Sequence, residues 1–204
     1  IGRKHAELIK KNFKNVEIYI LTKQKITGYK KIQNLKDIKK IDPKYIVISS
    51  ETEKHFAQLK YLEKNFKNVN ILVEKPLFNK YKKINIKNNK VFIGYNLRFH
   101  PIIILLRKVI FKKKAINIKI ITNSFLPNWQ KNISYEKSYS ANKKLGGGVT
   151  LDLSHELDLA TWLFGKIKIE YLKIGKFSKL KINSEDTLKL IGKIGNSNFY
   201  LDLN

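Results

Sequence analysis

The chain has 204 residues, of which 43% are hydrophobic, a content that can fill one sizeable core or two smaller ones and that excludes an intrinsically disordered chain. Its 42 basic and 16 acidic residues give a formal net charge of +26, yet only three of the bases are arginines, the side chain preferred for phosphate and base recognition. We therefore expect no specific nucleic-acid binding.

Cysteine is absent, which excludes disulfides and thiolate metal sites and fits a cytoplasmic protein. We expect no metal site. The longest candidate membrane run, residues 102–106, is far shorter than the roughly 20 residues that a spanning helix needs, so no membrane span is expected.

The first 95 residues alternate short apolar runs with helical patterns. Continuous, β-branched runs predict buried strands at 16–21, 45–49, 70–73 and 91–95. Apolar residues at helical spacing predict helices at 5–13 and 53–66. Strand-helix-strand repetition of this kind predicts an α/β fold with a parallel sheet.

The pattern changes after Tyr95. A helix is predicted at 101–111, and the alternation of Ile116, Ile118 and Ile120 predicts a half-exposed antiparallel strand at 115–123. A long polar and aromatic loop, expected to be functional, runs from 124 to 145. Further antiparallel strands are predicted at 167–177, 187–194 and 198–203.

Three glycines, Gly146 to Gly148, open a predicted helix that carries Asp152 and His155. Residues three apart share a helical face, so this acid and imidazole can serve the same substrate hydroxyl or carbonyl as a proton-exchanging pair. The alternative is a glycine turn followed by a helix whose polar residues face water.

Polar residues also follow two predicted parallel strands. Ser49 and Ser50 come after one strand, and Glu74 and Lys75 after the next. Open parallel sheets bind ligands at the carboxyl ends of their strands. Lys75 could be one more surface lysine, but its position between an acid and a proline at a strand end favours a functional role.

Five motifs in chain order carry a resemblance to a known family: Ile-Gly-Arg-Lys-His at the start, Ser-Ser-x-Thr-x-x-His, Glu-Lys-Pro-Leu, Gly-Tyr-Asn-x-Arg-Phe-His-Pro, and Gly-Gly-Gly-x-x-x-Asp-x-x-His-x-x-Asp. They resemble the Gfo/Idh/MocA family of NAD(P)-dependent oxidoreductases, which act on sugars and cyclitols. The resemblance implies a Rossmann-type parallel-sheet domain at 1–95, followed by an α+β substrate-binding domain with a mainly antiparallel open sheet at 96–204.

The resemblance also implies site residues. Lys75 matches the lysine that contacts nicotinamide and substrate hydroxyl, His155 the proton-exchanging histidine, and Asp152 its acidic companion. Asn96 and Arg98 match the segment beside the substrate, and the Lys75-Pro76 bond is expected to be cis. The residues expected to contact the cofactor are Ile1, Gly2, Lys23, Ser49, Ser50, Thr52, His55, Glu74 and Lys75.

Two departures from the family pattern stand out. Many members space the acid and the histidine four residues apart, whereas Asp152 and His155 are three apart. The strand predicted at 16–21, which the resemblance makes the second strand of the Rossmann fold, ends near Lys23, where an NAD enzyme often has an acid for the ribose 2′-hydroxyl. A lysine there suits the 2′-phosphate of NADP, which we favour slightly over NAD.

The loop at 126–141 resembles a subset of the family associated with surface-polysaccharide and nucleotide-sugar genes. Trp129 and Tyr139 are expected to contact the substrate, and Tyr135 to pack internally. The expected activity is hydride transfer between NAD(P) and a carbon of a sugar or nucleotide sugar, in a homo-oligomer formed through the antiparallel sheet. The alternative is an inactive relative that acts as a sensor or assembly subunit.

The resemblance further implies a fragment. If Gly2 is the third glycine of the dinucleotide fingerprint, the first Rossmann strand precedes residue 1, and the chain ends at Asn204 inside a predicted strand. We expect these 204 residues alone to fold poorly and to bind no dinucleotide tightly.

Overall fold

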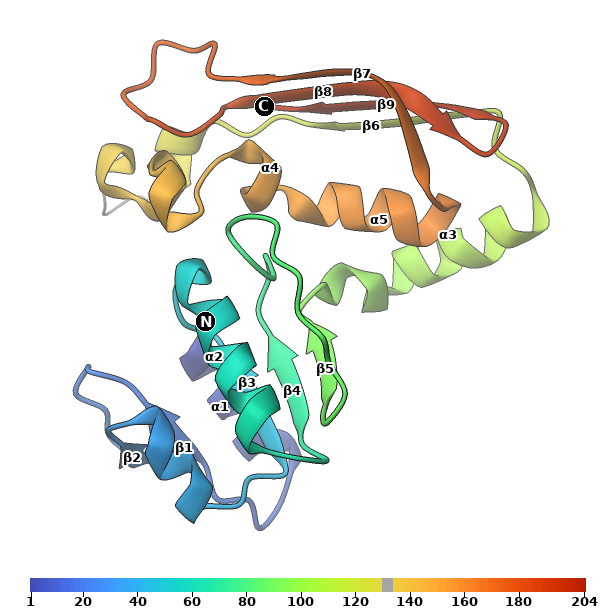
Figure 1. The fold of residues 1–204 in the computed structure, drawn as a ribbon. Coiled ribbons are helices and arrows are strands. Elements are labelled where there is room, and N and C mark those ends of the chain that lie inside the picture. The colour runs from blue at the N-terminus through green and yellow to red at the C-terminus, as the bar shows by residue number, and fades with distance from the viewer. Residues whose placement is uncertain (130–133) are drawn as a thin grey trace. The chain divides into compact units, whose positions relative to one another are not determined.

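The computed structural model describes residues 1–129 and 134–204, so part of the predicted loop at 124–145 lies outside the described residues. The chain forms two compact units, unit 1 (Ile1–Gly94) and unit 2 (Tyr95–Asn204). Unit 1 is built on parallel strands, and unit 2 on a mixed four-stranded sheet with helices on one face (Figure 1). The fold class predicted from the sequence is confirmed.

Unit 1 contains five short strands in two parallel sheets. One sheet pairs β1 (Tyr19–Leu21) with β2 (Lys30–Ile32), and the other has the order β3 (Tyr45–Ile48), β4 (Asn70–Val73), β5 (Lys90–Ile93). The helices are α1 (Gly2–Asn12), the 3-10 helix η1 (Leu35–Lys40) and α2 (Thr52–Asn65). The sequence did not predict β2, because this strand contains a single apolar residue between polar neighbours.

The core of unit 1 lies between α2 and the sheet. Leu59 and Leu62 of the helix are buried together with Ile48, Ile71 and Val73 of β3 and β4. Figure 1 shows α2 in front of this sheet and α1 behind it. The central strand β4 is covered in this way, which fixes the positions of the residues that follow β3 and β4.

The expectation of fully buried strands is wrong for β1 and β5. Leu21 at the end of β1 is exposed, and so are Phe92 and Ile93 of β5. Both strands lie at a sheet edge. A β-branched, apolar composition indicates strand propensity. Burial depends instead on which other elements pack on the strand, and the sequence of the strand alone does not determine this.

A buried carboxylate holds the segment before β5 against α2. Glu63 accepts hydrogen bonds from the backbone N–H groups of Lys87 (2.7 Å) and Asn88 (2.6 Å) and from the side chain of Asn89 (2.8 Å). Burial alone would raise the pKa of Glu63, but these hydrogen bonds outweigh it and hold the pKa below its ordinary value of 4.5.

Replacing Glu63 by alanine is expected to destabilise the protein by about 3 kcal/mol, because the backbone N–H groups of Lys87 and Asn88 and the side chain of Asn89 lose a charged acceptor. Because the folded-state pKa is lowered, the stabilisation is present above the unfolded-state pKa and is lost as the pH falls through the folded-state value. Urea unfolding of the intact gene product at several pH values measures both effects. Lys64→Ala, an exposed neighbour on α2, is the control; equal stability of the two variants would contradict the assignment.

Unit 2 begins with the 3-10 helix η2 (Asn96–Phe99) and helix α3 (Pro101–Lys112). Strand β6 (Asn117–Thr122) leads into a segment of short 3-10 helices, η3 (Leu126–Asn128), η4 (Tyr135–Lys137), η5 (Tyr139–Ala141) and η6 (Lys143–Leu145). Helices α4 (Val149–Asp152) and α5 (Ser154–Phe164) follow, and then strands β7 (Ile167–Gly175), β8 (Thr187–Ile194) and β9 (Ser197–Leu203).

The sheet of unit 2 has the strand order β6-β9-β8-β7, and α4 and α5 lie on one of its faces (Figure 1). Leu190, Phe199 and Leu201 point to that face and form its core with Val149 and Ala160. Pairing is antiparallel for β7-β8 and β8-β9, as predicted.

The expectation that β6 is antiparallel is wrong. Strand β6 runs parallel to β9, from Asn117 opposite Asn198 to Thr122 opposite Leu203. The helical segment after β6 returns the chain to the far edge of the sheet at β7, and two reversals then bring β9 beside β6 in the same direction. Alternating apolar residues report one buried face and carry no information about strand direction.

Candidate functional site

The ends of β3 and β4 bring two predicted site segments together in unit 1. Ile48 and Val73 are register partners at the carboxyl ends of these strands, and Ser49 and Glu74 follow them directly. The Glu74 backbone N–H donates to the Ile48 carbonyl (2.9 Å), which continues the ladder by one residue. The Lys75-Pro76 peptide bond is cis, as expected from the sequence.

The start of α1 reaches the same place. A Cβ atom on Gly2 would lie 2.7 Å from Ser49 Oγ, so only glycine fits without displacing that side chain. His5 Nε2 lies 2.5 Å from Glu74 Oε1. The N-terminus of α1 has no side-chain cap and no acid in its first turn, so its backbone N–H groups and helix dipole suit an anionic group.

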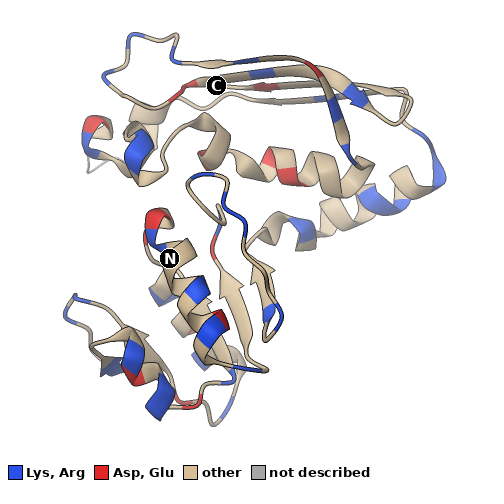
Figure 2. Ribbon diagram, viewed as in Figure 1, with Lys and Arg blue, Asp and Glu red and all other residues tan. Residues whose placement is uncertain are grey.

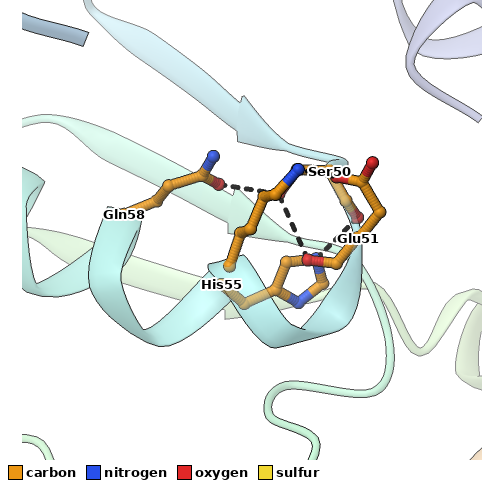
Figure 3. Close-up of polar contacts among 5 residues, drawn as sticks. Ser50, Glu51, His55 and Gln58 are labelled. Atoms are coloured by element: carbon orange, nitrogen blue, oxygen red, sulfur yellow. Dashed lines mark hydrogen bonds and ion pairs between the residues drawn. The ribbon is translucent and has the colours of Figure 1, made fainter. Parts of the chain in front are cut away.

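His55 fastens the two strand-end segments to each other. Its ring is only 1% exposed, with Nε2 3.0 Å from the Ser50 carbonyl oxygen and Nδ1 3.1 and 3.2 Å from those of Pro76 and Leu77. Figure 3 shows the ring turned toward the Ser50 segment, with Gln58 one turn further along α2. Both ring nitrogens of His55 therefore lie within hydrogen-bond distance of backbone carbonyl oxygens, Nε2 at Ser50 and Nδ1 at Pro76 and Leu77.

Replacing His55 by alanine is expected to destabilise the protein by about 2 to 3 kcal/mol, because it removes these hydrogen bonds and leaves a cavity. If His55 instead served mainly as a cofactor ligand, stability would be unchanged and only cofactor affinity would fall. Chemical unfolding and cofactor titration of the same variant separate the two. Lys60→Ala, at an exposed position on α2, is the control.

The other predicted cofactor residues of unit 1 lie at or near these elements. Ser50 Oγ donates to Gln58 Oε1 (2.8 Å), and Thr52 is the first residue of α2. Ile1 is largely exposed in front of α1, and Lys23 is exposed after β1. Glu51 pairs with Lys54 at the start of α2, and this hydrogen bond lowers the pKa of Glu51.

The glycine hinge of unit 2 is required by its backbone. Gly148 has φ +124°, a conformation that other residues rarely adopt, and a Cβ on Gly147 would lie 2.2 Å from the Tyr139 carbonyl oxygen. The single helix predicted after the hinge is wrong. The helix breaks at Leu153, which has ψ +30°, so Asp152 ends α4 and His155 belongs to α5.

The apolar pattern hides this break. Leu153 and Leu157 both pack on the core of unit 2, with Val149 and Ala160 on either side, so helical spacing continues through a non-helical residue. The two functional candidates therefore do not sit on one continuous helical face, which was the basis of the sequence argument for their pairing.

Asp152 and His155 each have an aromatic neighbour within unit 2. The Tyr139 hydroxyl donates to Asp152 Oδ1 (2.6 Å), and burial, with the carboxylate next in effect, raises the pKa of Tyr139 to about 12. The Tyr139 hydroxyl thus stays protonated and remains a donor. The ring of His155 packs edge-on against Tyr95, with 5.5 Å between ring centroids.

Arg98 is held by a buried partner. Its Nε donates to Asp158 Oδ2 (2.8 Å), and its second nitrogen donates to Oδ1. The side chain of Asp158 is 6% exposed and that of Arg98 37%. The hydrogen bonds to Asp158 raise the pKa of Arg98. Asn96, in the same 3-10 helix, is exposed.

Trp129 and Asp152 line one cavity of about 320 Å³ in unit 2. The Trp129 indole donates to Ser124 Oγ (2.5 Å), which fixes the ring. Tyr135 is half-buried and its hydroxyl accepts from the Lys181 backbone N–H (3.4 Å).

The structure adds residues that the sequence did not single out. His5 is the last residue of the first motif, three after Gly2, and Asp158 is the last residue of the glycine-Asp-His motif, so both carried a spacing signal. Glu185, in the cavity wall, had none. Within residues 1–129 and 134–204, no group of three or more His, Asp or Glu could hold a metal ion, and no helix is long and apolar enough to cross a membrane.

Basic residues occur along helices, strands and connections of both units rather than in one segment (Figure 2). This distribution follows the composition, with 42 bases in 204 residues.

A parallel α/β unit with an uncapped helix start at its strand ends, followed by a unit with an open mixed sheet, has the architecture of dinucleotide-binding oxidoreductases. Residues 112–196 match the model of the oxidoreductase family C-terminal alpha/beta domain. Residues 112–196 thus match the C-terminal domain of the Gfo/Idh/MocA family, the family that the motifs of the chain resemble. No curated protein sequence matches it.

Solved structures share this fold at low identity. The WlbA (WbpB) dehydrogenase of Thermus thermophilus, in complex with NAD and alpha-ketoglutarate, has a TM-score of 0.76 and 17% identity over 100% of this chain and 69% of its own. The WlbA dehydrogenase of Chromobacterium violaceum, with NADH and UDP-GlcNAcA, has a TM-score of 0.74 and 16% identity over 99% of this chain and 63% of its own.

A levoglucosan dehydrogenase in complex with NADH and levoglucosan has a TM-score of 0.65 and 16% identity, over 85% of this chain and 51% of its own. The chain thus spans between 51% and 69% of the length of these three neighbours.

Proposed function

We propose that the intact gene product is an NAD(P)-dependent oxidoreductase that moves a hydride between the cofactor and a hydroxyl- or carbonyl-bearing carbon of a sugar or nucleotide sugar. The observation that carries the proposal is the meeting of the uncapped α1 start, Ser49 and the Glu74-Lys75 segment at the carboxyl ends of parallel strands. NAD or NADH in the three neighbours supports the cofactor class. UDP-GlcNAcA and levoglucosan in two of them support a sugar substrate.

The residues of unit 1 fit a dinucleotide at this edge. The α1 start offers backbone N–H groups without a competing acid, and Gly2 keeps its backbone close to Ser49. When bound, the nicotinamide accepts or supplies the hydride. The His5–Glu74 pair fixes one carboxylate oxygen beside Lys75, and His55 holds the backbone on either side. Ser50, Thr52 and Ile1 remain proposed contacts.

The proposed proton chemistry uses Lys75 and His155. The Lys75 ammonium group donates to the substrate oxygen and stabilises the negative charge that develops on it during hydride transfer. His155 takes the hydroxyl proton or returns it. Asp152 supports this exchange, with Tyr139 holding one of its oxygens. Asn96, Arg98, Trp129 and Tyr139 are the proposed substrate contacts, Arg98 through a guanidinium that Asp158 keeps in place.

The cofactor preference is proposed to favour NADP slightly, because the exposed Lys23 after β1 suits a 2′-phosphate. Lys23→Asp should then weaken NADPH binding while leaving NADH binding nearly unchanged. Titrations of both cofactors against the variant and the parent measure this.

The proposed pathway is the biosynthesis of surface polysaccharides or other glycans. The intact gene product is incubated with NAD or NADP and a panel of sugars and nucleotide sugars, and the absorbance of reduced nicotinamide is followed. The proposal expects turnover with at least one sugar of the panel. Cofactor binding with no turnover on any of them would favour an inactive relative acting as a sensor or assembly subunit.

Self-association through the sheet of unit 2 is also proposed. Ile191 and its cross-strand partners Tyr171 and Tyr200 lie on the face opposite the core. Tyr171 and Ile191 are about half exposed, and Ile121 of β6 adds a further exposed apolar side chain. Sedimentation of the intact gene product and of an Ile191→Asp variant tests whether a second copy covers this face.

A further inference from the structure

The cavity of unit 2 has an unusual lining for this chain. It lies where the segment after β6, the start of α4 and the connection before β8 meet, and its volume of about 320 Å³ falls in the range of small-ligand sites. Its described lining contains three carboxylates, Asp152, Glu185 and Asp186, and no lysine or arginine. In a chain with 42 bases and 16 acids, this is an acidic site within a strongly basic protein.

Two of these carboxylates are already engaged. Asp186 accepts from the backbone N–H groups of Phe177 (2.8 Å) and Ser178 (3.0 Å), and Asp152 accepts from the Tyr139 hydroxyl. The Glu185 carboxylate has no hydrogen bond or ion pair within residues 1–129 and 134–204. Of the three carboxylates in the described lining, Glu185 is therefore the one whose oxygens a ligand can use.

Glycine at position 148 leaves room for this carboxylate. A Cβ on Gly148 would lie 2.5 Å from Glu185 Oε1, and the positive φ of Gly148 disfavours any other residue. The hinge that opens α4 thus also allows Glu185 to lie against the backbone beside Asp152, the acid of the glycine-Asp-His motif.

Trp129 supplies an aromatic wall. Its indole N–H is already bonded to Ser124, so the ring lines the cavity as a fixed apolar surface with Phe125 and Leu180 nearby in the lining. An aromatic face next to an unused carboxylate matches a ring that has C–H bonds on its faces and hydroxyl or amino groups at its edge. A carboxylate or phosphate on that ring would meet like charges with no base in the described lining to compensate.

We propose that this cavity binds the ring of a hydroxyl-rich substrate that carries no negative charge on that ring, with Trp129 along one face and Glu185 accepting from its hydroxyl or amino groups. The inference rests on the proposed function and narrows its substrate class. An uncharged or amine-bearing sugar ring enters the cavity, a uronate does not, and the diphosphate of any nucleotide sugar stays outside it.

Binding of three matched probes tests the proposal without turnover or cofactor: glucose, glucosamine and glucuronate. The intact gene product carries Trp162→Phe, which leaves Trp129 as the fluorophore of this chain. Glucose and glucosamine are expected to bind at least about tenfold more tightly than glucuronate. Glucuronate binding as tightly as glucosamine, or no binding of any probe, overturns the proposal.

Glu185→Gln gives the residue-level test. It should bring the affinity for glucuronate closer to the affinities for glucose and glucosamine, while Glu170→Gln, which changes an exposed carboxylate on β7, should change nothing. An unchanged ratio of affinities in Glu185→Gln overturns the role of Glu185. These experiments measure binding and not hydride transfer, so a negative result would not contradict the proposed oxidoreductase activity. Turnover of a uronate would contradict the exclusion of uronates from the cavity while supporting the oxidoreductase activity, so the two proposals can fail separately.

Discussion

Replacing Lys75 by methionine is expected to lower kcat/KM for hydride transfer by about a thousandfold in the intact gene product, with the dissociation constant of the cofactor changed by no more than about twofold. Methionine keeps the length and apolar stem of the side chain but removes the ammonium group, which is the part proposed to stabilise charge on the substrate oxygen. Steady-state kinetics and cofactor titration of the same preparation measure both quantities.

Lys80→Met is the matched control, because Lys80 is an exposed lysine five positions further along the same connection. It should retain the turnover of the parent. Undiminished turnover in Lys75→Met would remove Lys75 from the proposed chemistry, whatever the control does.

Breaking the Arg98–Asp158 pair is expected to have the largest effect on stability. Arg98→Met leaves the Asp158 carboxylate buried without its bidentate partner, at a cost of about 3 to 5 kcal/mol. The double variant Arg98→Met/Asp158→Leu should recover much of this loss, because two apolar side chains can replace a buried ion pair without leaving a charge behind. Urea unfolding of Arg98→Met, Asp158→Leu and the double variant, alongside the parent, completes a double-mutant cycle.

Arg107→Met serves as the control for this cycle. Arg107 stacks on Trp162, with 4.2 Å from its guanidinium carbon to the ring centroid, so its loss should cost only about 0.5 to 1 kcal/mol. A loss in Arg98→Met no larger than in Arg107→Met would contradict a structural role for the pair and leave substrate contact as the main role of Arg98.

Strong local patterns were enough to predict much of the fold. The strands β4 and β8 and the helices α2 and α3 lie within a residue or two of their predicted bounds, because each combines a clear apolar period with turn or cap residues at its ends. The parallel sheet of unit 1 followed from the alternation of such elements.

The errors have a common physical origin in long-range contacts. The direction of β6 depends on where β9 lies, whose register partners come 81 residues later in the chain, and the exposure of Phe92 depends on what packs over β5. The break at Leu153 is invisible to an apolar period that continues through it. None of these is encoded in the local window that predicts an element.

The candidate site, like the fold, was predicted where local motifs were sufficient and missed where long-range contacts were needed. Motif spacing singled out Lys75, Asp152 and His155 as candidates, because they belong to short stretches with a fixed order of residues. The partners that hold the site segments were not predicted, because Glu74 meets His5 and Asp158 meets Arg98 only after the chain has folded. Glu185 was missed for the same reason, since its neighbour Gly148 lies 37 residues earlier in the chain.

Transfer of deuterium from C4 of reduced nicotinamide to a sugar carbon tests the central claim most directly. The intact gene product is mixed with cofactor labelled at C4 and with carbonyl-containing sugars and nucleotide sugars, and the products are analysed by mass spectrometry and NMR. We expect one deuterium on the former carbonyl carbon, and none with Lys75→Met. Cofactor that binds but keeps all of its label with every sugar would contradict it.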